Sequence, residues 1–217
     1  HINHGVKAVS GAIEKIQIDP ESFKATYSTV NGARPIGICG SGMIDALAEV
    51  RRAQLINPDG RLNPELKEEF HRRRETLEFT IVPATDSATG SDIVLTQKDV
   101  RELQLAKAAI YTGCKALMEE KKVAPKDIQV LYVAGAFGNY LNLRNAVAIG
   151  MLPPIPEKRF KLVGNSAVAG AKLGLISSEM RRKAEVIAEG ARYLELGARK
   201  TFNRDFTASL DFPENPN

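Results

Sequence analysis

Residues 130–142 read VLYVAGAFGNYLN, and this stretch indicates the fold class. Apolar, β-favouring residues run as far as Ala134, small residues follow at Gly135–Gly138, and a helical pattern begins after them. Local sequence leaves two interpretations of the small-residue turn open. It is either packing geometry or a place where a ligand approaches the backbone, because glycine carries no Cβ that would hold the ligand away.

This stretch is part of a longer alternation of strands and helices. The patterns predict a strand and a helix in turn over about residues 128–134, 143–149, 160–163 and 166–175, and then a further helix over 178–189. Alternation of this kind is typical of parallel α/β structure. A closing helix or irregular tail is expected over 202–210.

The first half of the chain begins with strand patterns that follow one another directly. Strands are predicted over about 11–18 and 23–30, with a short third strand at 34–38 and a helix over 43–53. Further along, the patterns predict a charged surface helix over 65–75, a strand over 77–82 and a long helix over 97–120. Thr96 and Asp99 resemble a capping box at the start of the long helix. The apolar face of that helix is expected at Leu103, Ala106, Ala109, Ile110 and Leu117.

The expected fold class is therefore α/β. We expect a mixed sheet whose first strands are antiparallel, followed by a βαβα portion, with helices on both faces. The whole of residues 1–217 reads as one domain, with a surface excursion near 55–92.

Composition excludes several classes of function. A net charge of +4 is mild, tryptophan is absent and acidic residues are interspersed with the basic clusters, so no nucleic-acid interface is expected. No apolar run approaches the roughly 20 residues that a membrane-spanning helix needs. Cys39 and Cys114 are far apart and match no metal-binding spacing, which favours reduced thiols in a cytoplasmic protein without a cluster of its own. The chain begins at His1 instead of methionine, which indicates a piece of a longer protein.

Three stretches share a strand end, a turn of small residues and a helix start. They are GICGSGMID (37–45), VAGAFGN (133–139) and LVGNSAVAGA (162–171). Ligands of open α/β sheets bind beyond the carboxyl ends of the strands, and a helix start there suits phosphate. Each stretch alone fits packing better than ligand binding, whereas three of them in one α/β domain favour a nucleotide cleft. Asp45 and Asp99 read as helix-capping carboxylates. No GxxxxGK[ST] loop and no GxGxxG fingerprint occurs in the sequence.

At GICGSGMID, TQKDVRELQLAKAAI, VAGAFGNYLNLRNAVAIGMLP and VGNSAVAGA the sequence resembles a known family. It is similar to the carboxy-terminal part of the reductive activators of corrinoid proteins. These are ferredoxin-like ATPases of the acetate-and-sugar-kinase/Hsp70/actin (ASKHA) superfamily, whose domains are ribonuclease-H-like. The resemblance runs over nearly the whole chain, with one departure, because Leu143 stands where proline is expected.

The resemblance implies an adenosine-contacting turn at Gly135–Gly138 and a helix connecting the two lobes over 164–171. The nucleotide-binding residues that it implies are Gly40, Ser41, Gly42, Gly135, Ala136, Phe137, Gly138, Asn139 and Asn165. It implies no catalytic or metal-binding residue in this chain, because the Asp-x-Gly-Thr phosphate loops and the iron–sulfur domain normally lie upstream.

The full protein would use ATP with Mg to drive electrons from its iron–sulfur cluster to a Co(II) corrinoid protein, restoring Co(I). The resemblance therefore implies an ATPase-coupled redox activator, of which this fragment alone is inactive. A sheet edge left open by the cut favours self-association into a homodimer. The alternatives are a lobe of an ASKHA small-molecule kinase, which needs an acceptor-binding carboxylate in the cleft, and a non-catalytic docking or dimerisation domain.

Overall fold

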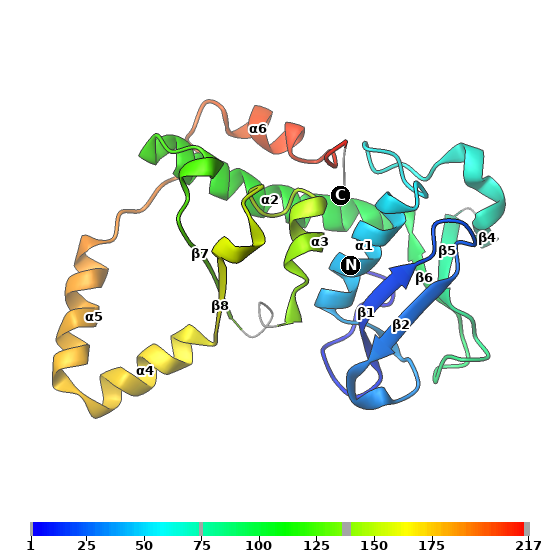
Figure 1. Ribbon diagram of the computed structural model, residues 1–217, viewed down its shortest axis with the longest axis horizontal. Coiled ribbons are helices and arrows are strands. Elements are labelled where there is room, and N and C mark those ends of the chain that lie inside the picture. Colours follow the sequence, from blue (N-terminus) through cyan, green and yellow to red (C-terminus); the bar gives the residue numbers. More distant parts are fainter. Residues whose placement is uncertain (1, 74–75, 136–139, 215–217) are drawn as a thin grey trace.

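The computed structural model describes residues 2–73, 76–135 and 140–214 (Figure 1). Its strands are β1 (Ala12–Ile18), β2 (Ala25–Thr29), β3 (Gly37–Ile38), β4 (His71–Arg73), β5 (Thr76–Val82), β6 (Ile93–Thr96), β7 (Leu131–Ala134) and β8 (Phe160–Gly164). Its α-helices are α1 (Gly40–Arg52), α2 (Gln97–Lys121), α3 (Leu143–Ala148), α4 (Ser166–Ile176), α5 (Ser178–Gly190) and α6 (Phe202–Ala208). The predicted α/β fold class, with antiparallel first strands and a later βαβα portion, is confirmed.

The first sheet has the strand order β2-β1-β3. Strand β1 runs antiparallel to β2 and parallel to β3, so the sheet is mixed as predicted. Along β1 the buried Ile16 and Ile18 alternate with the exposed Lys15 and Gln17, which is the pattern of a strand with one face on a core. Helix α1 packs against β1.

The second sheet has the order β4-β5-β6 and is antiparallel throughout. Here the predicted surface helix over 65–75 is wrong in its second half, because only Pro64–Glu69 are helical and His71–Arg73 pair as a strand. Phe70 lies edge-to-face against Phe79, with ring centroids 6.3 Å apart, and both rings are buried. Burial of Phe70 and pairing with β5 outweigh the helix propensity of a charged run. The excursion predicted near 55–92 therefore contributes to the core and does not lie wholly on the surface.

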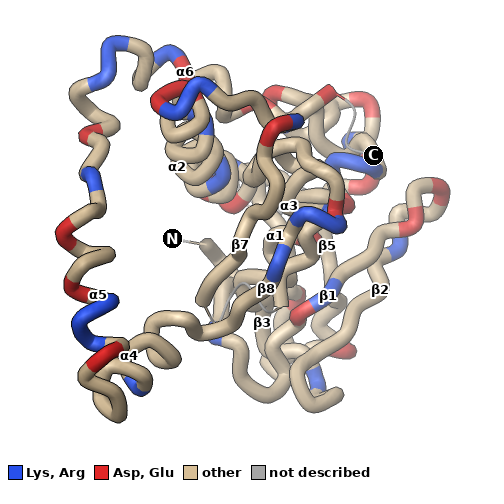
Figure 2. The backbone as a smooth tube through the Cα atoms, turned by 60° about the vertical axis from the view of Figure 1, so that its left-hand side comes forward, with Lys and Arg blue, Asp and Glu red and all other residues tan. Residues whose placement is uncertain are grey.

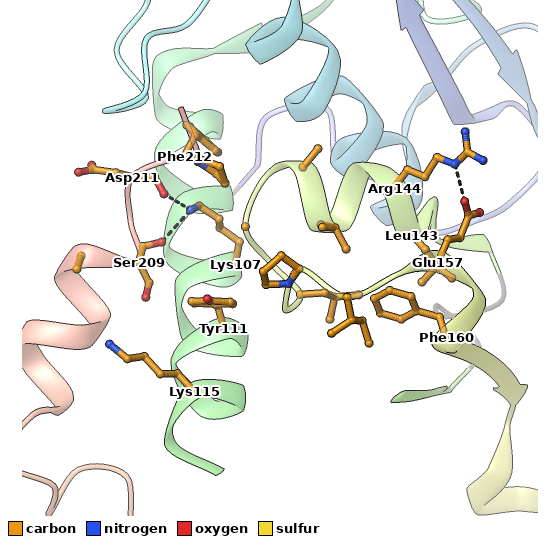
Figure 3. Close-up of a pocket in the computed structure, with 18 of the residues that line it drawn as sticks. Lys107, Tyr111, Lys115, Leu143, Arg144, Glu157, Phe160, Ser209, Asp211 and Phe212 are labelled. Atoms are coloured by element: carbon orange, nitrogen blue, oxygen red, sulfur yellow. Dashed lines mark hydrogen bonds and ion pairs between the residues drawn. The ribbon is translucent and has the colours of Figure 1, made fainter. Parts of the chain in front are cut away.

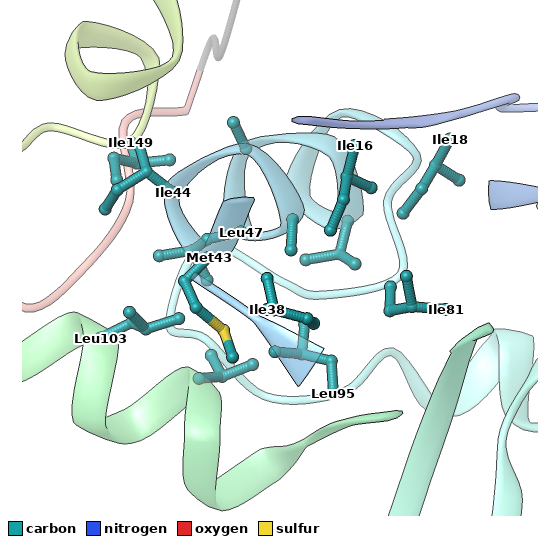
Figure 4. Packing of buried hydrophobic residues seen from close by; sticks show 14 of the residues in the cluster. Ile16, Ile18, Ile38, Met43, Ile44, Leu47, Ile81, Leu95, Leu103 and Ile149 are labelled. Atoms are coloured by element: carbon teal, nitrogen blue, oxygen red, sulfur yellow. The ribbon is translucent and has the colours of Figure 1, made fainter. Parts of the chain in front are cut away.

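The hydrophobic core lies between these two sheets and helices α1 and α2 (Figure 4). Ile38 from β3, Leu47 from α1 and Leu95 from β6 are fully or almost fully buried. Ile149, at the end of α3, closes one side of the cluster. Each such side chain contributes about 1.5–3 kcal/mol by leaving water. Helix α3 is thus anchored on the same core as α1.

The capping box predicted at the start of α2 is confirmed. The backbone N–H of Asp99 donates to Oγ1 of Thr96 at 3.1 Å, and the backbone N–H of Thr96 donates to Oδ2 of Asp99 at 3.0 Å. Asp99 is therefore a structural cap, as its position at the helix start indicated.

The apolar face predicted for α2 is wrong apart from Leu103. Ile110 and Leu117 are 40% and 57% exposed, and Gln104 and Lys107 are buried in their place. The buried side of the helix is formed by Asp99, Val100, Leu103, Gln104, Lys107, Ala108, Thr112 and Ala116. Gln104 and Lys107 donate hydrogen bonds to main-chain oxygens of residues 209–211, so a sequence pattern that counts only apolar residues identifies the wrong face.

The last described residues return along α2 (Figure 1). Helix α6 contacts α2, and the ammonium of Lys115 donates to Oδ1 of Asp205 at 2.9 Å. This contact, followed by hydrogen bonds from Thr201 and Arg204, holds the pKa of Asp205 at about 2. We call residues 201–214 the C-terminal segment.

Strands β7 and β8 form a parallel pair, as the alternation predicted. From the end of β8, α4 and α5 stand apart from the body in both Figure 1 and Figure 2, and we call residues 166–190 the arm. The arm is exposed almost throughout, including the apolar Leu175 (77%) and Ile176 (81%). Apart from Ser166 and Lys172, helix α4 consists of apolar residues and glycines on all sides, a composition that normally belongs to a buried helix. Parallel sheets are likewise normally covered on both faces.

Candidate functional site

Two of the predicted site residues meet at the carboxyl end of the parallel strands. The backbone N–H of Gly135, after β7, donates to the carbonyl oxygen of Gly164, at the end of β8, at 2.7 Å. Asn165 follows directly and starts α4, where its Oδ1 accepts a hydrogen bond from the backbone N–H of Val168 at 3.2 Å. A small-residue turn and a capped helix start therefore share one sheet end, which is the position where ligands of α/β sheets bind.

Gly135 is a glycine for a conformational reason. Its φ of +100° belongs to the region that side chains of L-amino acids rarely adopt. A Cβ built there would meet no atom of the described residues within 4 Å, so crowding by this part of the chain is not what requires glycine. The other four predicted residues of this turn, Ala136, Phe137, Gly138 and Asn139, lie outside the described residues.

The GSG turn (Gly40–Gly42) forms the first turn of α1 instead of preceding the helix. Ser41 is buried and its Oγ lies 3.3 Å from Sγ of Cys39. A Cβ on Gly42 would lie only 2.4 Å from the carbonyl oxygen of Ile13, so glycine is required for α1 to lie against β1. Packing thus requires glycine at position 42, and within this turn it is Gly40 that is exposed.

A buried polar relay, which the sequence did not single out, connects α1 with α3. The Nδ2 of Asn145 donates to Oδ1 of Asp45 at 2.6 Å, and Oδ1 of Asn145 accepts from Arg52 at 2.6 Å. Arg52 also donates to Glu49, whose Oε2 accepts from the backbone N–H of Ile18 at 3.0 Å. We call Asp45, Asn145, Arg52 and Glu49 the relay.

Asp45 is therefore not the helix cap that the sequence suggested. It lies in the second turn of α1, its side chain is 4% exposed, and burial raises the pKa of its carboxyl, against the hydrogen bond from Asn145. The signal for Asn145 was an amide inside the otherwise apolar stretch NAVAIG, where a polar side chain on a buried face needs a partner.

A polar pocket of about 500 Å³ lies beside the relay. Its walls come from β1, β2, α1 and α3, and its lining includes the three basic side chains of Lys15, Arg52 and Arg144. Asp45 and Glu49 supply the acidic groups.

A larger and mainly apolar cavity of about 740 Å³ lies between α2, α3 and the C-terminal segment (Figure 3). Lys107 lies on the α2 side, 2% exposed, with Nζ donating to the carbonyl oxygens of Ser209 at 2.8 Å and Asp211 at 2.5 Å. Its ammonium also lies 4.8 Å from the ring centroid of Phe212. Burial lowers the pKa of Lys107 to about 8. Lys107 thus binds the C-terminal segment through main-chain oxygens.

Within residues 2–73, 76–135 and 140–214, no three His, Cys, Asp or Glu side chains gather as a metal would require. Cys39 and Cys114 are both free thiols. In the same part of the chain, no helix has the length and apolar character needed to cross a bilayer.

Comparison with known proteins gives a consistent set of relatives. The family model described as the C-terminal domain of RACo, the ASKHA domain, matches residues 1–217. The corrinoid activation enzyme RamQ of Eubacterium limosum is 37% identical, over 97% of this chain and 37% of its own length. The reductase of the Co(II) methylated amine-specific corrinoid protein of Methanosarcina barkeri is 25% identical, over 90% of this chain and 32% of its own length.

A solved structure shares the fold. The reductive activator for a corrinoid, iron–sulfur protein superposes with a TM-score of 0.90 at 38% identity, over 98% of this chain and 34% of that chain. The chain therefore spans about a third of the length of the relatives that it matches.

Proposed function

Since the chain belongs to the family of RACo C-terminal ASKHA domains, we propose that residues 1–217 are the carboxy-terminal lobe of an ATPase domain in a longer reductive activator. The longer protein uses ATP to drive electrons from an iron–sulfur cluster, held elsewhere in it, to a corrinoid protein. The electron converts Co(II) to Co(I). The names of the relatives, a corrinoid activation enzyme and a Co(II) corrinoid protein reductase, support this function.

The observation that carries the proposal is the shared end of β7 and β8. Gly135 holds a conformation that favours glycine, none of the described residues occupies the place where its side chain would stand, and Asn165 starts a helix beside it. Such an end lets a nucleotide come within contact of the backbone, so these residues fit ATP. We propose that the nucleotide-binding residues are Gly40, Ser41, Gly42, Gly135, Ala136, Phe137, Gly138, Asn139 and Asn165, and that Mg enters with ATP in the longer protein.

The exposed arm supports the proposal that this chain is one lobe of a longer protein. Val186 and Ile187 are 67% and 73% exposed, and the apolar α4 has no cover among the described residues. Apolar surfaces of this extent mark interaction sites. We propose that the remainder of the longer protein covers the arm and both faces of the β7–β8 pair.

We propose a corrinoid protein as the partner and the cytoplasm as the location. The two free thiols support a reducing compartment. A homodimer remains part of the proposal, because β7 and β8 pair only with each other among the described strands and so leave edges available.

One prediction tests whether ATP hydrolysis requires the part of the longer protein that lies outside residues 1–217. The purified 217-residue chain is expected to release no phosphate from ATP above background, because it carries no Asp-x-Gly-Thr loop, whereas the longer protein does. Phosphate release over time measures both, with the Gly135→Val variant of the 217-residue chain as a control for contaminating ATPases. Release that depends on the chain and disappears in the variant would contradict the proposal.

A further inference from the structure

The relay holds a short helix in one orientation. Helix α3 has six residues, and helices of that length are not stable without tertiary contacts. Ala146 and Ile149 bury its apolar side, but apolar contacts tolerate small rotations and shifts. The amide of Asn145 is directional, because it donates to Asp45 and accepts from Arg52, each at 2.6 Å. The relay therefore fixes the rotation of α3 about its own axis and its position along α1.

Both of these helices begin on the side of the molecule where the parallel strands end. Figure 1 shows the starts of α1 and α3 at its lower side, together with the ends of β7 and β8. Helix α1 begins with the GSG turn, and α3 is the first helix after Gly135. Helix α3 is tied to the residues that precede β8, because Nε of Arg144 donates to Oε2 of Glu157 at 2.7 Å, and Gly135 donates to Gly164 at the end of β8. A shift of α3 along α1 would therefore move the β7–β8 pair, and with it Gly135, relative to the GSG turn.

We propose that Asp45 and Asn145 are positioning residues, which hold α3 against α1 and thereby set the spacing between the GSG turn and the strand end at Gly135. This inference rests on the proposed nucleotide site and deepens it. Asp45 and Asn145 do not touch the nucleotide; they act through the helices that carry its binding turns.

The surroundings make Asp45 sensitive to a second negative charge. Glu49 and Arg52 face it from α1, Lys15 lines the same pocket from β1, and Arg144 does so from α3. Burial already disfavours the ionised form of Asp45. A carboxylate introduced at position 145 would face Asp45 directly, and two such groups share one proton or repel each other.

The test is ATP binding by the longer protein with three substitutions at the relay. In Asn145→Asp the two carboxylates repel at pH 8, so we expect the affinity for ATP to fall roughly tenfold relative to wild type. At pH 5 the pair binds one proton and the hydrogen bond forms again, so the affinity should return to within about threefold of the wild-type value at that pH. Asn145→Leu cannot form the bond at either pH and should stay weak at both.

The reciprocal double variant provides the rescue. In Asp45→Asn with Asn145→Asp, the amide at 45 donates to the carboxylate at 145, which still accepts from Arg52, so affinity should recover at pH 8 as well. Asn203→Asp makes the same chemical change at an exposed position of α6 and should leave binding unchanged.

The outcomes separate the inference from its premise. A wild-type protein that binds no ATP would overturn the proposed function and this inference together. ATP binding in wild type that is unchanged in Asn145→Asp at pH 8 would overturn this inference alone. The inference would also be overturned if Asn145→Asp lost binding at pH 8 and binding recovered neither at pH 5 nor in the double variant. That result would assign Asn145 a merely structural role.

Discussion

Replacing Gly135 with valine in the longer protein is expected to lower the affinity for ATP between about tenfold and a hundredfold. Valine is β-branched and avoids a φ of +100°, at a cost of roughly 1–3 kcal/mol, so the turn after β7 must leave its conformation. Its side chain would also occupy the space beside the backbone that the described residues leave open and that we assign to the nucleotide. Calorimetric titration with a non-hydrolysable ATP analogue measures the loss.

Gly190→Val is the matched control. Gly190 ends α5, has no positive φ, and a Cβ there also meets no atom within 4 Å. We expect unchanged affinity in this variant. If Gly135→Val bound the analogue as tightly as Gly190→Val does, the strand end would not be part of the nucleotide site.

Lys107→Met is expected to release the C-terminal segment from α2. Lys107 is 2% exposed, and its ammonium donates to two main-chain oxygens, those of Ser209 and Asp211. Hydrogen bonds to a charged group contribute about 1.5–3 kcal/mol, and the oxygens left without a donor remain partly buried. The free energy of opening of α6 should fall by about 3 kcal/mol, which corresponds to amide hydrogen exchange roughly a hundredfold faster.

The difference between wild type and this variant should depend on pH. Burial lowers the pKa of Lys107 from 10.5 to about 8 in the folded state. Between these values the folded lysine is neutral while the exposed lysine is charged, so opening takes up a proton and becomes harder as pH rises. The free energy of opening of α6 should therefore rise with pH between pH 8 and 10.5 in wild type, but not in Lys107→Met. The rise is at most about 1.4 kcal/mol for each pH unit.

Lys98→Met controls for the loss of a lysine on the same helix. Lys98 lies in the first turn of α2 and is exposed, so its removal should leave the exchange of α6 amides unchanged at every pH. Equal exchange in Lys107→Met and wild type would show that Lys107 does not hold the C-terminal segment.

Local signals predicted the secondary structure where they were strong. The alternation of Ile16 and Ile18 with polar residues identified β1, and Thr96 with Asp99 located the start of α2 within the sequence. These features depend on neighbours within a few residues. The strands β7 and β8 were predicted on the same basis, and their parallel pairing followed from the helix that lies between them.

The errors arose where distant residues decide the structure. Gln104 and Lys107 are buried because carbonyl oxygens more than 100 residues away accept their hydrogen bonds, and no local pattern contains that information. His71–Arg73 form a strand because they pair with β5, although the charged run favours a helix. Tertiary contacts override weak local propensities at both places.

The candidate site was predictable in part. The sequence identified the small-residue turns, and the structure brings Gly135 beside Gly164 and Asn165 as the strand order implies. The structure shows that Gly42 packs against Ile13. The sequence alone could not predict this contact, because it does not show that α1 lies on β1. The pairing within the relay could not be found from sequence, because Asp45 and Asn145 are 100 positions apart, and an amide in an apolar stretch indicates that a partner is needed without identifying it.

The most direct test of the proposed function is the reduction of a corrinoid protein by the longer protein. The corrinoid protein is prepared as Co(II), an excess of a low-potential reductant is added, and the visible absorbance of Co(I) is followed with and without ATP. We predict that Co(I) accumulates when ATP and the longer protein are both present and stays at background when either is omitted. Accumulation at the same rate and to the same extent without ATP, or none with it, would contradict the assignment as an ATP-dependent reductive activator.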